Sequence, residues 1–461
     1  RCAKVAIVRR RIGIAAAVVL LVAVASLGVR FFLPEARFVY GVVAAGEDEA
    51  LLLTRRNEDH GTSFWIERVG LDGRLRWSFE TTPLAASDAL GHSGVAADDS
   101  RVIVLARDGE REFALALDRK AGRRLWQTAL PGDRPTGRIG PMVMIDGPRV
   151  YLVRETDAGQ GPTERIDALA LEDGALLWTF APETGIDLHV LAPGRLLVGL
   201  RGGGGRVLDG TSGAVSQTIE LSRVICTIAE GALASARGQA MLVPAAADRP
   251  IWRIEAEQSW YASDGPCGAR GEDPVLVARR GSDGAMMLVR VDRGSGRPRF
   301  QTELGAGNVE PLVSLDGRLP RFLPVAGFGS DEGGAIRQEF AVFDLEDGSE
   351  VRRAAIRDHV EVVATPERAW LWLPFKGLLV GLDPATGAIE RASAVQGLGT
   401  SHARREDLRF GSLWLHGYGW ARPEALPWAA VDLRSGEFLR LNGIASARDA
   451  TAEARASLGG S

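Results

Sequence analysis

The sequence has few of the residues on which redox and metal chemistry usually depend. It contains three cysteines, Cys2, Cys226 and Cys267, none adjacent to another, and no C-x-x-C-H signal for haem attachment. Its six histidines form no i, i+2 or i, i+4 pair of the kind that binds zinc, and neither H-E-x-x-H nor G-x-S-x-G occurs. Local motifs therefore give no support to haem, zinc or serine-hydrolase chemistry.

Charge of one sign is not concentrated anywhere in the chain. Lys plus Arg number 55 against 59 Asp plus Glu, a formal net charge of -4, and the charges are scattered along the sequence. A nucleic-acid partner requires a concentrated basic surface to neutralise phosphates. We therefore expect no nucleic-acid partner.

Helical periodicity over more than two turns is lacking after Leu33, whereas the N-terminal segment is strongly apolar. The run from Ile12 to Val29 has no charge, is about long enough to span a bilayer as a helix, and follows a basic segment over residues 1–11. The positive-inside rule then predicts a transmembrane signal anchor at 12–33 in the cytoplasmic membrane, with the remaining chain on the periplasmic, extracytoplasmic side. A cleaved signal peptide ending near Ala23-Val24-Ala25 is the alternative.

One phrase recurs along the rest of the chain. An alternating strand ends in aspartate, a three-residue turn and a glycine follow, and a short strand then begins. Asp hydrogen-bonds the backbone of its own turn and Gly supplies positive φ. The full copies place Asp118 before Gly122, Asp209 before Gly213, Asp292 before Gly296, Asp344 before Gly348, Asp383 before Gly387 and Asp432 before Gly436. Shortened copies lie at Asp72-Gly73 and Asp173-Gly174, and a degenerate copy lies around Asp248.

Each copy follows another β-rich run, such as Val102–Leu105 or Val150–Val153, so a unit offers about four short strands in roughly 40 to 50 residues. This is the blade length of a β-propeller. Nine units can be counted, but rings of eight are commoner, so we expect an all-β, eight-bladed propeller over residues 36–445 and leave nine blades open. Residues 446–461, rich in Ala, Ser, Arg and Gly, are expected to form a flexible tail.

The phrase from Leu117 to Trp126 resembles the quinoprotein-type (PQQ-like) repeat, which pyrroloquinoline quinone dehydrogenases share with non-catalytic, BamB-like relatives. The resemblance implies that the tryptophan of each unit docks between adjacent blades, which assigns this role to Trp77, Trp126, Trp178 and Trp252. The sequence departs from the pattern at the equivalent positions Gln217, Phe300, Arg352, Arg391 and Arg440.

The two branches of this family differ in chemistry. The dehydrogenases need a carboxylate base, calcium ligands beside the quinone and, in many members, a disulfide between adjacent cysteines. This sequence lacks adjacent cysteines, and although Asp and Glu are plentiful, no local group of them indicates the base or the ligands. No catalytic, cofactor-binding or metal-binding residue is therefore predicted. The first hypothesis is a non-enzymatic module that binds envelope proteins or polymers through propeller rim loops; the alternative is a membrane-tethered oxidoreductase acting on alcohols or sugars with pyrroloquinoline quinone and calcium.

Two further features bear on the exported part. Cys226 and Cys267 lie near the entry strands of consecutive units in an oxidising compartment, so a disulfide between them is a hypothesis. The longest connections are the expected contact surface and lie at residues 155–163, 305–320, 328–338 and 397–407.

Overall fold

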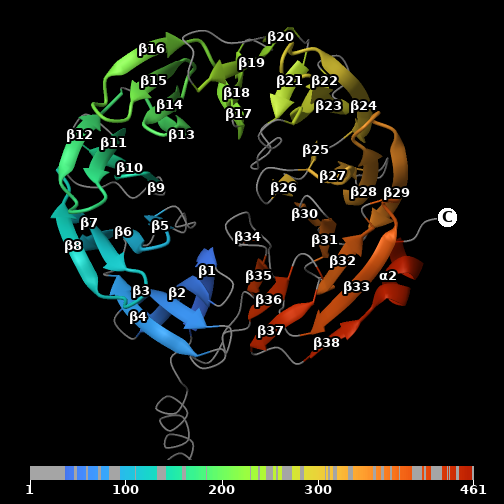
Figure 1. Ribbon diagram of the computed structural model, residues 1–461, viewed down its shortest axis with the longest axis horizontal. Coiled ribbons are helices and arrows are strands. Elements are labelled where there is room, and N and C mark those ends of the chain that lie inside the picture. The colour runs from blue at the N-terminus through green and yellow to red at the C-terminus, as the bar shows by residue number, and fades with distance from the viewer. Residues whose placement is uncertain are drawn as a thin grey trace, which may run out of the picture.

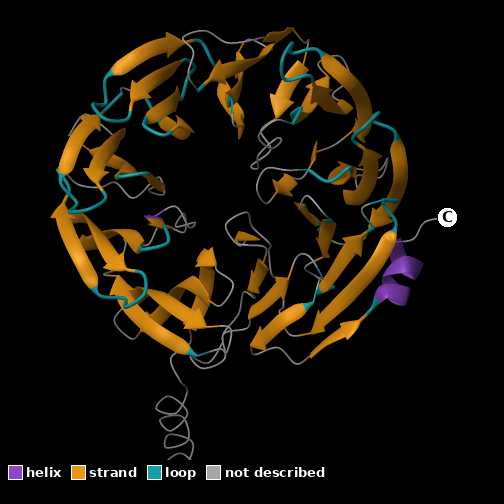
Figure 2. Ribbon diagram, in the orientation of Figure 1, coloured by secondary structure: helices purple, strands orange, loops and turns teal. Residues whose placement is uncertain are grey.

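The strands of the computed structural model form nine sheets arranged in a ring (Figure 1). The structure describes residues 37–45, 49–58, 61–70, 74–81, 94–108, 111–131, 142–157, 162–182, 184–228, 230–236, 239–245, 253–255, 258–261, 272–280, 285–306, 308–309, 312–314, 319–330, 336–356, 360–364, 368–373, 376–383, 385–396, 408–409, 412–416, 428–432, 435, 437–442 and 446–458. Strands dominate the described part, with one short helix outside the ring (Figure 2).

The first five sheets are four-stranded antiparallel meanders, numbered here in chain order. Sheet 1 contains β1 (Arg37–Ala45), β2 (Glu49–Glu58), β3 (Gly61–Gly70) and β4 (Leu75–Thr81). Sheet 2 contains β5 (Val95–Ala97), β6 (Arg101–Asp108), β7 (Arg111–Asp118) and β8 (Arg124–Ala129). Sheet 3 contains β9 (Met142–Asp146), β10 (Arg149–Asp157), β11 (Pro162–Ala170) and β12 (Leu176–Phe180). Sheet 4 contains β13 (Ile186–Ala192), β14 (Arg195–Leu200), β15 (Gly205–Asp209) and β16 (Val215–Ile219). Sheet 5 contains β17 (Arg223–Ile228), β18 (Gly231–Ala236), β19 (Gln239–Pro244) and β20 (Arg253–Glu255).

Sheets 6 and 9 are also four-stranded meanders, whereas sheets 7 and 8 depart from this pattern. Sheet 6 contains β21 (Gln258–Tyr261), β22 (Val275–Arg280), β23 (Ala285–Val291) and β24 (Pro298–Ala306). Sheet 7 contains β25 (Asn308–Val309), β27 (Phe322–Ser330), β28 (Ile336–Asp344) and β29 (Glu350–Ile356). Sheet 8 has six strands, β26 (Leu312–Ser314), β30 (Glu361–Ala364), β31 (Ala369–Leu373), β32 (Leu378–Leu382), β33 (Ile389–Gln396) and β38 (Ser446–Asp449). Sheet 9 contains β34 (Leu408–Arg409), β35 (Ser412–His416), β36 (Trp428–Asp432) and β37 (Phe438–Asn442), and the helix is α2 (Thr451–Leu458).

The position of a strand in its sheet explains its sequence pattern. The middle strand β7 is a continuous apolar run whose residues Phe113–Leu117 are all buried, because sheets pack against both of its faces. The outer strand β8 alternates between exposed and half-buried residues, because one side of the ring's edge faces solvent. The strand that ends in the turn aspartate, expected to alternate, is thus a middle strand buried on both faces, and the short strand after the glycine is the outer strand.

The apolar core is a series of clusters between neighbouring sheets. One cluster joins Leu51 and Ile66 of sheet 1 to Val104 and Leu115 of sheet 2, and similar clusters follow for each successive pair up to sheets 7 and 8. Sheet 1 also contacts sheet 9, through β1 and β35, so the first and last sheets lie side by side (Figure 1). This closed ring of radial antiparallel sheets is the architecture of a β-propeller.

The nine sheets among the described residues match the nine repeat units counted in the sequence, where eight blades were expected and nine were left open. Two segments do not stay in their own unit. β26 pairs in parallel with β30, and β38 pairs antiparallel with β33, so sheet 8 receives a strand at its inner edge and another at its outer edge. Sheet 8 is thereby extended at both edges, by a segment that precedes it and a segment that follows it in the chain.

The C-terminal segment corrects a prediction. A flexible tail was expected over residues 446–461, but residues 446–449 form β38 and 451–458 form α2. Ala454 and Leu458 are buried in the same apolar cluster as Ile389 of β33. The tail prediction was wrong for residues 446–458 because composition alone did not show that alanines at this spacing meet an apolar sheet edge.

The predicted transmembrane anchor at 12–33 and the basic segment at 1–11 lie outside the described residues. Among the residues that are described, no helix has both the length and the apolar character required to cross a bilayer.

Packing of α2 against sheet 8 can be tested with one charge placed on either face of the helix. We expect Ala454→Asp to lower the free energy of unfolding by more than about 2 kcal/mol, because it buries an unpaired carboxylate. Ala452→Asp adds the same charge at an exposed position of the same helix and should change stability by less than about 0.5 kcal/mol. Denaturant unfolding measures both; equal behaviour of the two variants would contradict the packed helix.

Candidate functional site

The repeat turns form one face of the ring and share one hydrogen-bonding scheme. In the turn from Asp118 to Gly122, the carbonyl of Asp118 accepts from the Gly122 N–H at 2.7 Å, and Asp118 Oδ1 accepts from the Ala121 N–H at 2.7 Å. Gly122 has a φ of 70°, which favours glycine. The turns beginning at Asp209, Asp292, Asp344 and Asp383 make the same glycine-to-aspartate backbone bond.

The copy at Asp173-Gly174 is a full-length turn, although its sequence reads as a shortened one. The Gly174 N–H donates to the carbonyl of Ala170, four residues earlier, as in the other turns. Asp173 lies inside the turn and accepts from the Ala175 N–H at 2.9 Å. Only the aspartate is displaced, so the backbone geometry depends on glycine and not on the position of the acid.

The tryptophans dock each sheet on the turn of the next. The Nε1–H groups of Trp77, Trp126 and Trp178 donate to the carbonyls of Arg119, Leu171 and Gly210 at 3.0, 3.0 and 2.9 Å. Each of these carbonyls lies one residue after the first residue of a turn. The indole rings also lie on the turn glycines, since a Cβ placed on Gly122 would be 2.5 Å from the ring of Trp77.

Where tryptophan is missing, other side chains make parts of the same contact. The ring of Phe300 lies on Gly348, and Arg290, its cross-strand neighbour, donates to the carbonyl of Leu345 that a tryptophan would have reached. Arg391, at the tryptophan position of sheet 8, donates to a different turn carbonyl, that of Ser435 in sheet 9. Arg290 was not identified from the sequence, because only the register of β23 and β24 places it beside Phe300.

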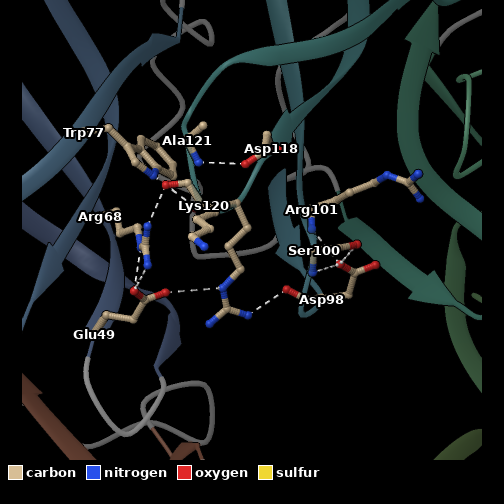
Figure 3. A network of polar contacts seen from close by, with 10 residues as sticks. Glu49, Arg68, Trp77, Asp98, Ser100, Arg101, Asp118, Lys120 and Ala121 are labelled. Atoms are coloured by element: carbon tan, nitrogen blue, oxygen red, sulfur yellow. Dashed lines mark hydrogen bonds and ion pairs between the residues drawn. The ribbon is translucent and has the colours of Figure 1, made fainter.

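Charged side chains reinforce the contact between sheets 1 and 2 (Figure 3). Glu49 accepts from Arg68 Nε at 2.6 Å and lies 3.8 Å from Nε of Arg119, which belongs to the next sheet. Arg119 Nη1 donates to the carbonyl of Asp98 at 2.6 Å, and Arg68 Nη1 donates to the carbonyl of Lys120 at 2.6 Å. The arginines thus tie the outer turn of sheet 2 to sheet 1.

A buried ion-pair network joins sheets 2 and 3. Arg154 and Asp167 are both buried, and Arg154 Nε donates to Asp167 Oδ2 at 2.6 Å. Arg154 Nη1 reaches Glu112 of sheet 2 at 3.0 Å, while Asp167 Oδ1 accepts from Arg165 and Thr179 at 2.7 Å each. The hydrogen bonds and the opposite charges within this network make such buried charges tolerable.

The pKa shifts in the described part have structural causes. The Ser295 hydroxyl and N–H lower the pKa of Asp292 to about 2, and the Ser212 N–H and hydroxyl lower the pKa of Asp209. Burial raises the pKa of the Tyr151 hydroxyl to about 12. None of these shifts moves a group toward neutral pH, where a general acid or base works best.

The structure places the remaining predicted residues as follows. Cys226 is disulfide-bonded, while Cys267 lies outside the described residues, so the pairing Cys226 with Cys267 stays a prediction. Trp252 and Gly436 also lie outside them. Strands β10 and β11 extend into the predicted contact loop 155–163, β27 and β28 extend into 328–338, and β25 and β26 lie within 305–320. Residues 158–161 and 331–335 and the loop 397–407 lie outside the described residues.

Two features of the outer surface remain unassigned by these contacts. A pocket of about 960 Å³ lies between sheet 8 and α2 and is lined by arginines and acids. Among these, Arg448 bonds to Glu453, Arg455 donates to the carbonyl of Ile389, and Asp449 accepts from the N–H of Thr451 at the start of α2. Large apolar side chains are exposed on the outer strands, at Leu75, Leu125, Leu176, Leu177, Val215 and Val351.

Residues 62–234 match the protein family described as outer membrane protein assembly factor BamB. The ring of sheets identifies the class of the fold, a β-propeller, and the family match together with the turn spacing identifies residues 62–234 as PQQ-like repeats. A comparison with curated proteins found no match.

Several solved structures are similar to the chain at low identity. BamB from Moraxella catarrhalis is 16% identical and aligns over 82% of this chain and 93% of its own, with a TM-score of 0.38. A europium-containing methanol dehydrogenase is 11% identical over 83% of this chain and 86% of its own, with a TM-score of 0.36. The C-terminal WD40 domain of Sif2 is 10% identical over 63% and 82%, with a TM-score of 0.35. Likenesses at this level carry no argument about activity.

A turn glycine such as Gly122 adopts a positive φ and also leaves room for the indole ring of the neighbouring sheet. Two substitutions separate these roles. Gly147→Ala adds a Cβ at a φ of 53° with nothing within 4 Å, so we expect a cost of about 1 to 2 kcal/mol from the left-handed backbone alone. Gly122→Ala adds the same strain and drives a Cβ into the ring of Trp77, so we expect a further loss of about 1 to 3 kcal/mol. Denaturant unfolding compares them; equal losses would show that the indole does not rest on the glycine.

Proposed function

We propose that this chain is a non-enzymatic interaction module of the cell envelope, whose ring binds envelope proteins or polymers through its rim. The match of residues 62–234 to the family of an outer membrane protein assembly factor carries this proposal. The described polar groups support it, because Arg154 and Glu112 form an ion pair between neighbouring sheets and the turn acids form hydrogen bonds within their own turns. Recognition is then left to the outer surface of the ring.

The ring is held at the cytoplasmic membrane by residues 12–33 and faces the periplasm in this proposal. The uncharged run that follows the basic segment supports it. A tether of this kind raises the effective concentration of the ring for partners in the same membrane. The ring has nine blades, one for each sheet among the described residues.

A quinone and calcium site was tested against the residues present. Among the described residues, no group of three or more His, Cys, Asp or Glu side chains is placed to hold a metal ion. The quinone-dependent oxidoreductase stays the alternative hypothesis, and we derive no chemical step through that cofactor.

Purification of the tagged, full-length chain from mildly crosslinked native membranes, followed by mass spectrometry, tests the interaction function. We expect a reproducible set of envelope proteins or a surface polymer to be recovered with the ring. The matched control is residues 1–36 fused to an unrelated soluble domain with the same tag. Recovery of the same set with this control, or of the propeller alone, would contradict the proposal.

The tether and the blade number can be measured together by cryo-electron microscopy of the chain in lipid nanodiscs. We expect nine blades in views along the ring axis and a single helix crossing the disc beside sheet 1 in side views. An eight-bladed ring would overturn the blade number alone. If intact-mass measurement shows that the mature chain begins after Ala25, residues 12–33 are a cleaved signal peptide and not an anchor. The proposal for the ring would not change.

A further inference from the structure

The outer strands carry exposed apolar side chains at equivalent places in the repeat. Leu75, Leu176 and Val215 lie two residues after the turn glycine of their sheets, and 47%, 43% and 47% of their surface is exposed. In sheet 8 the equivalent residue is Ile389, which is only 3% exposed. The same position is therefore open in three sheets and covered in a fourth.

The cover over Ile389 is a strand followed by a short helix. β38 pairs antiparallel with β33, from Ser393 opposite Asp449 to Gln396 opposite Ser446. Ala454 and Leu458 of α2 are buried in the same cluster as Ile389. Arg455 then donates from Nε to the carbonyl of Ile389 and from Nη2 to the carbonyl of Glu390, both at 3.0 Å. The fold thus contains its own example of an extended segment added to an outer edge.

The outer edge of sheet 3 lacks the features that usually protect an edge strand. β12 reads Leu-Leu-Trp-Thr-Phe, with no charged residue and no proline, and 43% of Leu176 and 46% of Leu177 are exposed. Edge strands are commonly protected by charges, proline or a covering segment, and an open apolar edge is a template for strand pairing. In the outer strands β4 and β8, by contrast, Arg76 and Arg124 provide such a charge. β12 is also the last strand in its sheet order, so its outer edge is open among the described strands.

The charges beside β12 favour a protein over a lipid surface. Glu172 and Asp173 are exposed in the turn that leads into the strand. These carboxylates repel an anionic membrane and attract a basic side chain.

The path of the chain points the same way. Arg37, where β1 begins, pairs with Arg56, while the other end of β2, at Glu49, pairs with Gly70 at the turn end of β3. The chain therefore enters sheet 1 at the face opposite to the repeat turns. A membrane that holds residues 1–36 would lie on the face away from the start of β12.

We propose that the outer edge of β12 binds an extended segment of a partner protein as a fifth, antiparallel strand. The segment places apolar side chains against Leu176 and Leu177 and a basic residue near Glu172 and Asp173. This inference rests on the proposed interaction function and names the kind of partner and the place where it docks. Strand addition gives affinity through main-chain hydrogen bonds and specificity through alternate side chains.

A designed peptide tests the edge without knowledge of the native partner. The probe is fluorescein-labelled Lys-Val-Thr-Val-Thr-Val-Lys, added to the purified full-length chain in detergent micelles and followed by fluorescence anisotropy. We expect saturable binding, a loss of at least tenfold in affinity for Leu177→Lys, and protection of β12 amides in hydrogen exchange. A probe with N-methylated alternate residues, which cannot donate on one edge, should lose binding to the same extent.

The matched control is Val351→Lys on the outer strand β29, where 44% of the side chain is exposed beside Glu350. It should bind the probe as the unchanged chain does, and both variants should keep the thermal midpoint of the unsubstituted chain.

Binding that survives Leu177→Lys, or that is unaffected by N-methylation of the probe, would overturn strand addition at β12. A dimer that dissociates in Leu177→Lys would assign the edge to a second copy. Phosphatidylglycerol vesicle binding lost in that variant would assign it to lipid. Failure here with successful recovery of envelope partners would refute the docking place and leave the interaction function standing.

Discussion

The structure depends on one contact, in which an aromatic ring of one sheet rests on the turn glycine of the next. The indole of Trp126 illustrates it, lying against Gly174 and donating to the carbonyl of Leu171. A side chain on that glycine would both strain the backbone and displace the ring. The turn therefore requires glycine at this position, and the glycine leaves room for the indole that contacts the next sheet. Apolar clusters between successive sheets then form around this fixed geometry.

The contact can be assembled from different residues because it has two separable components. Stacking needs a flat or aliphatic group over the glycine, and the hydrogen bond needs a donor near the exposed carbonyl. Trp178 supplies both components, whereas between sheets 6 and 7 Phe300 supplies the ring and Arg290 supplies the donor. Arg391 supplies a donor to Ser435 in sheet 9. Loss of tryptophan from later repeats is thus compatible with an intact ring.

Local features of the fold could be predicted from the sequence, and long-range pairings could not. The spacing from Asp209 to Gly213 defines a turn by itself, because all of its hydrogen bonds lie within a few residues. The number of sheets, nine where eight were expected, depends on ring closure between β1 and β35, which no local pattern records. The strand at 446–449 was read as a tail, because its partner β33 lies about fifty residues earlier in the chain.

The candidate docking edge follows from a comparison that only the structure allows. Every unit ends in an outer strand, so sequence periodicity treats Leu176 and Ile389 as the same kind of residue. Their exposure differs because a segment distant in sequence covers one and not the other. The unequal covering of equivalent edges is what distinguishes one blade from another here. A partner that recognises a single blade must therefore read the outer edge and its flanking turn, since the docking contacts inside the ring repeat from sheet to sheet.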